Sequence, residues 1–188
     1  MAWEYLETKR FEMRFKLIAS YLEGKTINKN IVDLNCGIAG VLKFIKPNFT
    51  SYYGNDVESK YINIAKEYNV LDTTFEVKDD KEVWFEDGKI DILMLLGYGA
   101  GEYAKGDIGE SKTAIESFQK LAVYYMPEII VIECIEAFET KFAFMTEQAI
   151  YLAQRGYLID LEASLAFGKG ELDKRLFLFF VRDGEKDK

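Results

Sequence analysis

The stretch IVDLNCGIAG, residues 31–40, decides how the rest of the chain is interpreted. It begins as a short apolar strand, passes one acid, Asp33, and enters a turn that contains Gly37 and Gly40. Glycine lets the backbone approach a ligand closely because it carries no side chain. Asn35 belongs to the few non-glycine residue types that tolerate a positive φ angle. The stretch therefore predicts a strand that leads into a nucleotide-type cofactor turn.

Strands and helices alternate along the remaining chain. Apolar segments of strand length occupy residues 31–34, 51–56, 74–78, 90–97, 128–134, 157–167 and 175–183. Helical periodicity is found in residues 3–23, 39–45, 58–69, 110–126 and 139–155. This alternation predicts an α/β fold with a Rossmann-like, doubly wound, seven-stranded and mostly parallel sheet. The last two strands have no helix between them, so they are expected to form an antiparallel C-terminal hairpin. We expect one domain over residues 1–188, with a frayed tail at 184–188.

The first predicted helix lies within residues 1–24 and carries two kinds of side chain. One apolar stripe at helical spacing consists of Phe11, Phe15, Ile18 and Leu22. Basic side chains between them are interpreted as a solvated face, namely Lys9, Arg10, Arg14 and Lys16. Gly24 is expected to end the helix.

Composition excludes several classes of protein. The net charge of −8 disfavours binding to bulk nucleic acid, because both partners would be negative. The chain has no histidine, which removes Ser-His-Asp and Cys-His mechanisms and the commonest zinc ligand, and we predict no metal site. Two cysteines do not make a disulfide scaffold. No signal peptide pattern or membrane-length apolar run occurs, so we predict a cytoplasmic protein without a membrane partner.

Two acids downstream of the glycine turn fit a cofactor site. Asp56 ends the second predicted strand, 19 residues after Gly37, where an acid commonly grips a ribose diol. Asp79 follows the third strand, where a contact with the adenine side is expected. Because the carboxyl ends of parallel strands share one edge of the sheet, these acids are expected to lie beside the turn.

In this order, the residues resemble class I S-adenosylmethionine-dependent methyltransferases over nearly the whole chain. The family's first motif is an acid followed by glycines at alternate positions, and here it reads Asp33 to Gly40 with Asn35 and Ala39 in place of two glycines. The terminal hairpin is similar to the family's antiparallel seventh strand. The resemblance implies S-adenosylmethionine as the cofactor, contacted by Asp33, Asn35, Cys36, Gly37, Asp56, Asp79 and Gly97.

A nicotinamide cofactor is the minor alternative, because Gly37-x-x-Gly40 also fits half of a dinucleotide turn. Asp33 would repel a pyrophosphate but would attract the ammonium group of S-adenosylmethionine. The chain also offers no second domain for a dehydrogenase substrate.

Within the family, the spacing is most similar to cytosine-C5 methyltransferases, and Glu133 would match the glutamate that hydrogen-bonds cytosine. Their Pro-Cys nucleophile motif is missing, because the corresponding position is Gly99, and so is their target-recognition region. Cys134 is a possible substitute nucleophile, although a small buried thiol is its commoner role.

The glycine-rich segment 97–110 follows the fourth predicted strand, where a methyl group would face its acceptor. Tyr98 could stack on a planar acceptor, and Glu102 and Glu133 are the candidate catalytic acids. Two hypotheses follow. The first is a methyltransferase of unknown acceptor; the second is a catalytically inactive binding or scaffolding subunit of a partner enzyme, derived from a cytosine-C5-methyltransferase-like ancestor.

Overall fold

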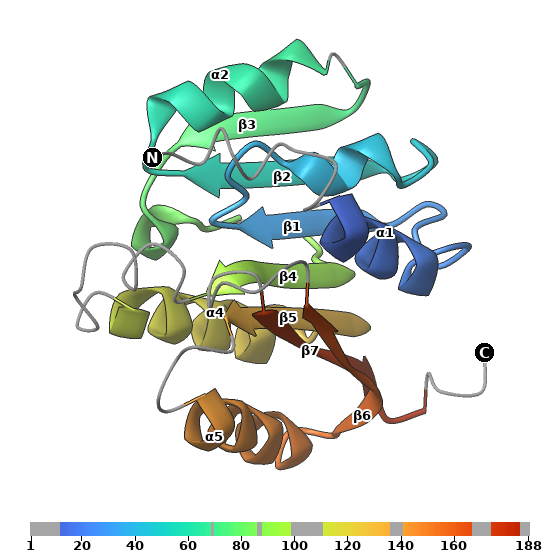
Figure 1. The fold of residues 1–188 in the computed structure, drawn as a ribbon, viewed down its shortest axis with the longest axis vertical. Coiled ribbons are helices and arrows are strands. Elements are labelled where there is room, and N and C mark those ends of the chain that lie inside the picture. The colour runs from blue at the N-terminus through green and yellow to red at the C-terminus, as the bar shows by residue number, and fades with distance from the viewer. Residues whose placement is uncertain are drawn as a thin grey trace.

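The computed structural model describes residues 12–68, 70–85, 88–98, 111–135, 141–166 and 174–184 (Figure 1). Its strands are β1 (Asn30–Leu34), β2 (Ser51–Asp56), β3 (Thr73–Val77), β4 (Ile92–Tyr98), β5 (Ile129–Ile135), β6 (Tyr157–Ala166) and β7 (Lys174–Arg182). Its α-helices are α1 (Glu12–Tyr21), α2 (Ser59–Glu67), α4 (Ser111–Tyr125) and α5 (Lys141–Ala153), with 3-10 turns η2 (Gly40–Lys43) and η3 (Asp80–Glu82). No described helix is long and apolar enough to cross a membrane.

All seven strands form one sheet in the order β3-β2-β1-β4-β5-β7-β6. The pairs β3-β2, β2-β1, β1-β4 and β4-β5 are parallel. β7 runs antiparallel to both β5 and β6. The order reverses direction between β1 and β4, and ligands of open α/β sheets bind beyond the carboxyl ends of the strands at such a switch. The predicted sheet and its antiparallel hairpin are therefore confirmed.

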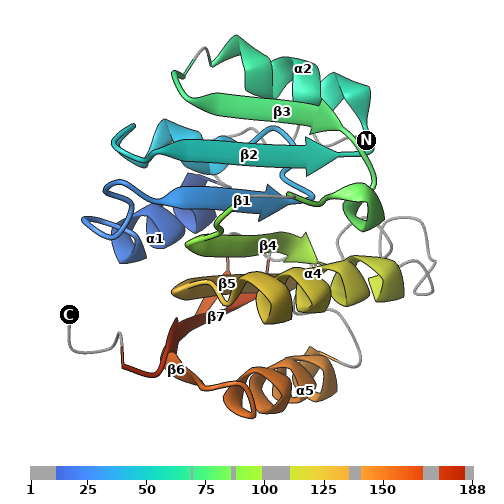
Figure 2. The ribbon, with the colours of Figure 1, turned by 180° about the vertical axis from the view of Figure 1, so that it is seen from behind.

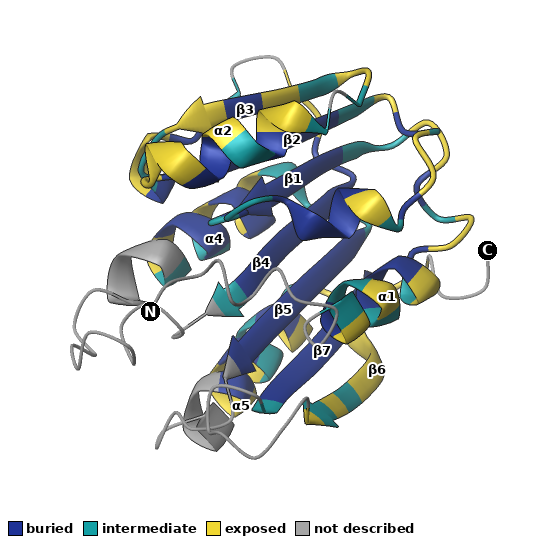
Figure 3. Cartoon of the chain, turned by 45° about the horizontal axis from the view of Figure 1, so that its top comes forward, coloured by how far each residue is buried: buried dark blue, intermediate teal, exposed yellow. Residues whose placement is uncertain are grey.

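Helices cover both faces of the sheet. α1, η2 and α2 pack on one face, against side chains that include Ile31, Tyr52 and Met94. α4 and α5 lie on the opposite face (Figure 2). Their side chains Phe118 and Leu152 belong to one buried cluster with strand residues such as Leu93. The central strands are buried along their length, whereas the edge strand β6 is largely exposed (Figure 3). Burial on two faces explains why the central strands have nearly continuous apolar sequences.

The α-helix predicted over residues 39–45 is wrong. Only a single 3-10 turn, η2, lies between β1 and β2, and its N-terminal flanking residue Ala39 has a left-handed φ of 53°. Pro47 disfavours the helical conformation at Lys46, so too few residues remain for an α-helix. Gly40 also presses against α1, since a Cβ at this position would lie 2.4 Å from the Phe15 ring. Close packing on α1 thus takes the place of a covering helix.

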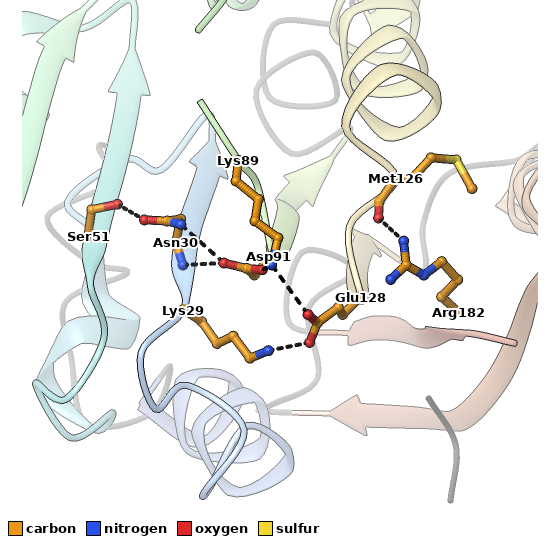
Figure 4. Close-up of polar contacts among 8 residues, drawn as sticks. All are labelled: Lys29, Asn30, Ser51, Lys89, Asp91, Met126, Glu128 and Arg182. Atoms are coloured by element: carbon orange, nitrogen blue, oxygen red, sulfur yellow. Dashed lines mark hydrogen bonds and ion pairs between the residues drawn. The ribbon is translucent and has the colours of Figure 1, made fainter. Parts of the chain in front are cut away.

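A polar network joins the strands at their amino ends (Figure 4). The Asp91 carboxylate accepts hydrogen bonds from the backbone and side-chain amides of Asn30 at 2.9 and 3.1 Å, and it pairs with Lys89 at 2.5 Å. Ser51 donates to the Asn30 side chain at 2.9 Å, which brings β2 into the network. These bonds fix the starts of three neighbouring strands.

The same network continues to β5 and β7. Glu128 pairs with Lys29 and, at 3.6 Å, with Lys89 (Figure 4). Arg182 at the end of β7 donates to the carbonyl oxygen of Met126 at 2.9 Å. The amino edge of the sheet is therefore closed by polar contacts within the chain.

Candidate functional site

The turn after β1 has a backbone that explains its composition. Asn35, Gly37 and Ala39 have φ angles of 52°, 54° and 53°, so three alternate residues are left-handed. This conformation costs a residue with a Cβ about 1 kcal/mol, and Asn and Gly adopt it most readily. The alternate glycines of the methyltransferase motif thus correspond to left-handed positions. Ala39 keeps the geometry at some cost and is buried in the core.

Asp33 lies at the carboxyl end of β1 with only 1% of its surface exposed. Its Oδ2 accepts a hydrogen bond from the Tyr52 hydroxyl at 2.5 Å, while its buried Oδ1 has no hydrogen-bond partner in the part of the chain that the structure describes. Burial raises the pKa of the Asp33 carboxyl from 3.8 to about 7, although the Tyr52 hydrogen bond and the Arg14 charge oppose this rise. A buried carboxylate with an unpartnered oxygen is suited to a cationic ligand group.

Asp56 lies beside the turn, as its spacing from Gly37 predicts. Its Oδ2 accepts the backbone N–H of Gly37 at 3.0 Å, and its Oδ1 accepts that of Glu58 at 2.8 Å. Burial raises the pKa of this carboxyl. Each carboxylate oxygen has a second lone pair, so Asp56 can still accept hydrogen bonds from hydroxyl groups of a ligand.

Asp80, next to the predicted Asp79, is hydrogen-bonded to the turn in a way that the sequence did not reveal. Its buried carboxylate accepts Nδ2–H bonds from Asn35 at 2.7 Å and from Asn55 at 2.6 Å. Burial raises the pKa of Asp80 to about 6. Asp79 is half-exposed and accepts the backbone N–H of Lys81 at 3.0 Å. Asp80 therefore holds the left-handed Asn35, and Asp79 stays a prediction for the adenine side.

Cys36 contributes to the packing of the turn. Its Sγ lies against β2, where a Cβ on Gly54 would come within 2.8 Å of the sulfur. Its backbone N–H donates to Asn55 O at 2.8 Å. Burial raises the pKa of the thiol well above its usual value, so the thiol is protonated at neutral pH and is a poor nucleophile. Any cofactor contact of Cys36 is thus expected to come from its backbone.

Glu133 on β5 is fully buried and engaged by three groups. Its Oε2 accepts hydrogen bonds from Arg14 and, at 2.8 Å, from the backbone N–H of Gly97, and its Oε1 lies 3.2 Å from Arg175 Nε. The expected solvated face of the first helix is therefore wrong at Arg14, which is only 6% exposed. Charge spacing along a helix could not show that residue 133, far along the sequence, supplies a buried partner.

The remaining predicted residues lie at or beyond the same edge. Tyr98 ends β4, where its backbone pairs with Cys134 of β5. Cys134 is fully buried, in keeping with a structural thiol. Glu102 and Gly99 lie outside the described residues, as does most of the 97–110 segment. The structure thus brings together Asp33, Gly37, Asp56, Gly97 and Glu133 around the carboxyl ends of the central strands.

This sheet, with its order and its antiparallel β7, is the class I methyltransferase fold. No protein-family model and no curated protein matches the chain. The N-methyltransferase NodS from Bradyrhizobium japonicum WM9 is similar with a TM-score of 0.69 and 12% identity, over 95% of this chain and 99% of NodS. Magnesium protoporphyrin IX methyltransferase from Synechocystis PCC 6803, solved with bound S-adenosylmethionine, gives 0.68 and 17%, over 93% and 80%. The methyltransferase domain of bacterial CtHen1-C gives 0.66 and 13%, over 94% and 100%.

Proposed function

We propose that the protein binds S-adenosylmethionine and transfers its methyl group to an acceptor that is not yet identified. The observation that carries this proposal is the buried, unpartnered Oδ1 of Asp33 beside a turn with three left-handed residues. The similar structures support it, because Synechocystis ChlM was solved with S-adenosylmethionine and NodS with S-adenosylhomocysteine. The cofactor would supply an electrophilic methyl group on a sulfonium, and the chain would supply positioning and exclusion of water.

The proposed contacts follow the order of the strands. Asp33 would pair with the ammonium group, and Asp56 would accept the ribose hydroxyls. The backbone of Asn35, Cys36 and Gly37 would pass close to the amino acid portion. Asp79 would contact the adenine side, and Gly97 would border the methyl group.

Glu133 fits a positioning role better than a catalytic one. A general base must reach the proton that it removes. The Glu133 carboxylate is instead buried between two arginines and the Gly97 amide. It orients the end of β4, where an acceptor would lie. Tyr98 and Glu102 are the candidates left for direct contact with the acceptor, and many direct methyl transfers need no strong base.

A second candidate function is a methyltransferase-fold subunit without catalysis, which supports a partner enzyme. Two observations favour it: Glu133 is engaged within the protein, and the Pro-Cys motif of cytosine-C5 methyltransferases is absent from the sequence. In this second proposal, the subunit descends from a cytosine-C5-methyltransferase-like ancestor and has lost catalysis. A nicotinamide cofactor is disfavoured, because the buried Asp33 carboxylate would face its pyrophosphate.

Isothermal titration with S-adenosylmethionine, S-adenosylhomocysteine and NAD tests these functions. We expect the first two ligands to bind, and Asp56→Ala to weaken both, because the variant loses the ribose acceptor. The matched control is Glu67→Ala, an exposed acid of α2 that should bind like the wild type. No binding of either methionine-derived ligand would refute the proposal.

Catalysis is tested separately with S-adenosylmethionine labelled in its methyl group. Fractionated extracts that contain protein, nucleic acid or small molecules are supplied as acceptors. Label transfer by the wild type that is lost in Asp56→Ala supports the enzyme. Tight cofactor binding without transfer to any fraction favours the second candidate.

A further inference from the structure

We propose that Arg14 of α1 binds the carboxylate of the amino acid portion of S-adenosylmethionine, opposite the ammonium site at Asp33. This inference rests on the proposed function. It assigns a cofactor contact to α1, a helix that contributes nothing to the glycine turn or to the acids at the strand ends. It also makes Arg14 and Asp33 the two halves of a site for a zwitterion.

The position of Arg14 carries the first step. Its Nη2 donates to Glu133 at the end of β5, and a Cβ built on Gly97 would lie 3.4 Å from the same nitrogen. The Arg14 charge also acts on the Asp33 carboxyl at the end of β1. The guanidinium therefore lies over the carboxyl ends of β1, β4 and β5, beside the switch in strand order.

The unused hydrogen-bonding capacity of Arg14 carries the second step. The residue is only 6% exposed, and its Nε–H has no hydrogen-bond partner among the described residues. A guanidinium presents its donors in a planar fork that matches the two oxygens of a carboxylate. A buried donor without a partner is costly, so a ligand carboxylate at this position would satisfy it.

The local charge balance carries the third step. Arg14 and Arg175 both pair with the fully buried carboxylate of Glu133. Asp33 also interacts electrostatically with Arg14, and its pKa of about 7 leaves it partly protonated at neutral pH. A ligand anion would give Arg14 a second negative partner beside the Glu133 carboxylate that it shares with Arg175, while a ligand cation would keep Asp33 ionised. The α-ammonium and α-carboxylate of an amino acid supply both charges from one carbon atom.

The test compares two ligands that differ only in this carboxylate, S-adenosylmethionine and decarboxylated S-adenosylmethionine. With the wild type, we expect loss of the carboxylate to weaken binding by about 10- to 100-fold. In Arg14→Gln, the affinity for S-adenosylmethionine should fall by a similar factor, whereas the affinity for the decarboxylated ligand should change by less than about threefold. Arg14→Lys keeps the charge beside Glu133, so its affinity for S-adenosylmethionine should lie between those of the wild type and Arg14→Gln.

Lys16→Gln is the matched control, because Lys16 is an exposed cation of the same helix. It should bind both ligands like the wild type. Equal affinity of the wild type for the two ligands would overturn the inference, and this readout needs no variant to fold. Equal weakening of both ligands in Arg14→Gln would overturn it as well. Failure of the wild type to bind either ligand would instead refute the proposed function.

Discussion

Replacing Asp33 with asparagine is expected to stabilise the protein at pH 8 and not at pH 5. Burial raises the pKa of this carboxyl from 3.8 to about 7 in the folded chain. The folded state therefore binds the proton more tightly than the unfolded state does. The stabilisation from protonated Asp33 is complete below about pH 4 and is lost as the pH rises towards 7. At pH 8 the folded chain carries the full cost of a buried, ionised carboxylate.

The magnitude follows from the two pKa values. A rise from 3.8 to about 7 corresponds to about 4 kcal/mol, at about 1.4 kcal/mol for each pH unit. The asparagine amide would bring unpartnered N–H groups to the position of Oδ1, which costs about 1–3 kcal/mol. We therefore expect Asp33→Asn to raise the free energy of unfolding by about 1–3 kcal/mol at pH 8. At pH 5, where wild-type Asp33 is mostly protonated, the variant should be equally stable or less stable.

Urea denaturation of both proteins at pH 5 and pH 8, followed by circular dichroism, measures this difference. The control is Glu67→Gln, an exposed change that should alter the free energy of unfolding by less than about 0.5 kcal/mol at either pH. If the free energies of unfolding of the wild type and Asp33→Asn differ by the same amount at both pH values, the reasoning is refuted. Under the proposed function, the stabilised variant should also bind S-adenosylhomocysteine more weakly, because it has lost the ammonium partner.

Three further changes test other parts of the site by urea denaturation. Gly40→Ala should cost about 1–3 kcal/mol, because the new Cβ would lie 2.4 Å from the Phe15 ring; Phe15→Leu in the same chain should recover part of this loss. Asp80→Ala should cost about 1–3 kcal/mol because the Asn35 side chain loses its acceptor and that of Asn55 keeps only the Lys78 carbonyl, whereas Asp79→Ala should cost less; equal costs would contradict the assigned roles. Glu133→Gln should cost about 3–5 kcal/mol, since it removes the buried negative charge that pairs with Arg14 and Arg175, and an unchanged free energy of unfolding would argue against this pairing.

Much of the fold follows from local patterns in the sequence. Apolar segments of strand length that alternate with helical periodicity are a property of neighbouring residues, and they predicted the parallel strands and the final hairpin. The helix expected after β1 failed because apolar content in residues 39–45 reflects packing against α1, which a local pattern does not contain. Tertiary contacts overrode helix propensity at this point.

The residues of the candidate site that lie at or just after the ends of strands could be predicted from the sequence. Asp33, Gly37 and Asp56 meet because parallel strands bring their carboxyl ends to one edge. Arg14 was not predictable, because a basic residue on a helix is exposed by default and its partner lies 119 residues away. Asp80 was missed for a similar reason, since only the folded chain distinguishes it from its half-exposed neighbour.

The polar network at the amino ends of the strands has a consequence for the opposite edge. Asp91 and Glu128 join β1, β4 and β5 through contacts within the chain alone (Figure 4). These contacts hold the starts of the strands in register without a ligand, which favours a preorganised edge at their carboxyl ends. Under the proposed function, acceptor specificity can then change at the carboxyl edge while the sheet beneath keeps its register.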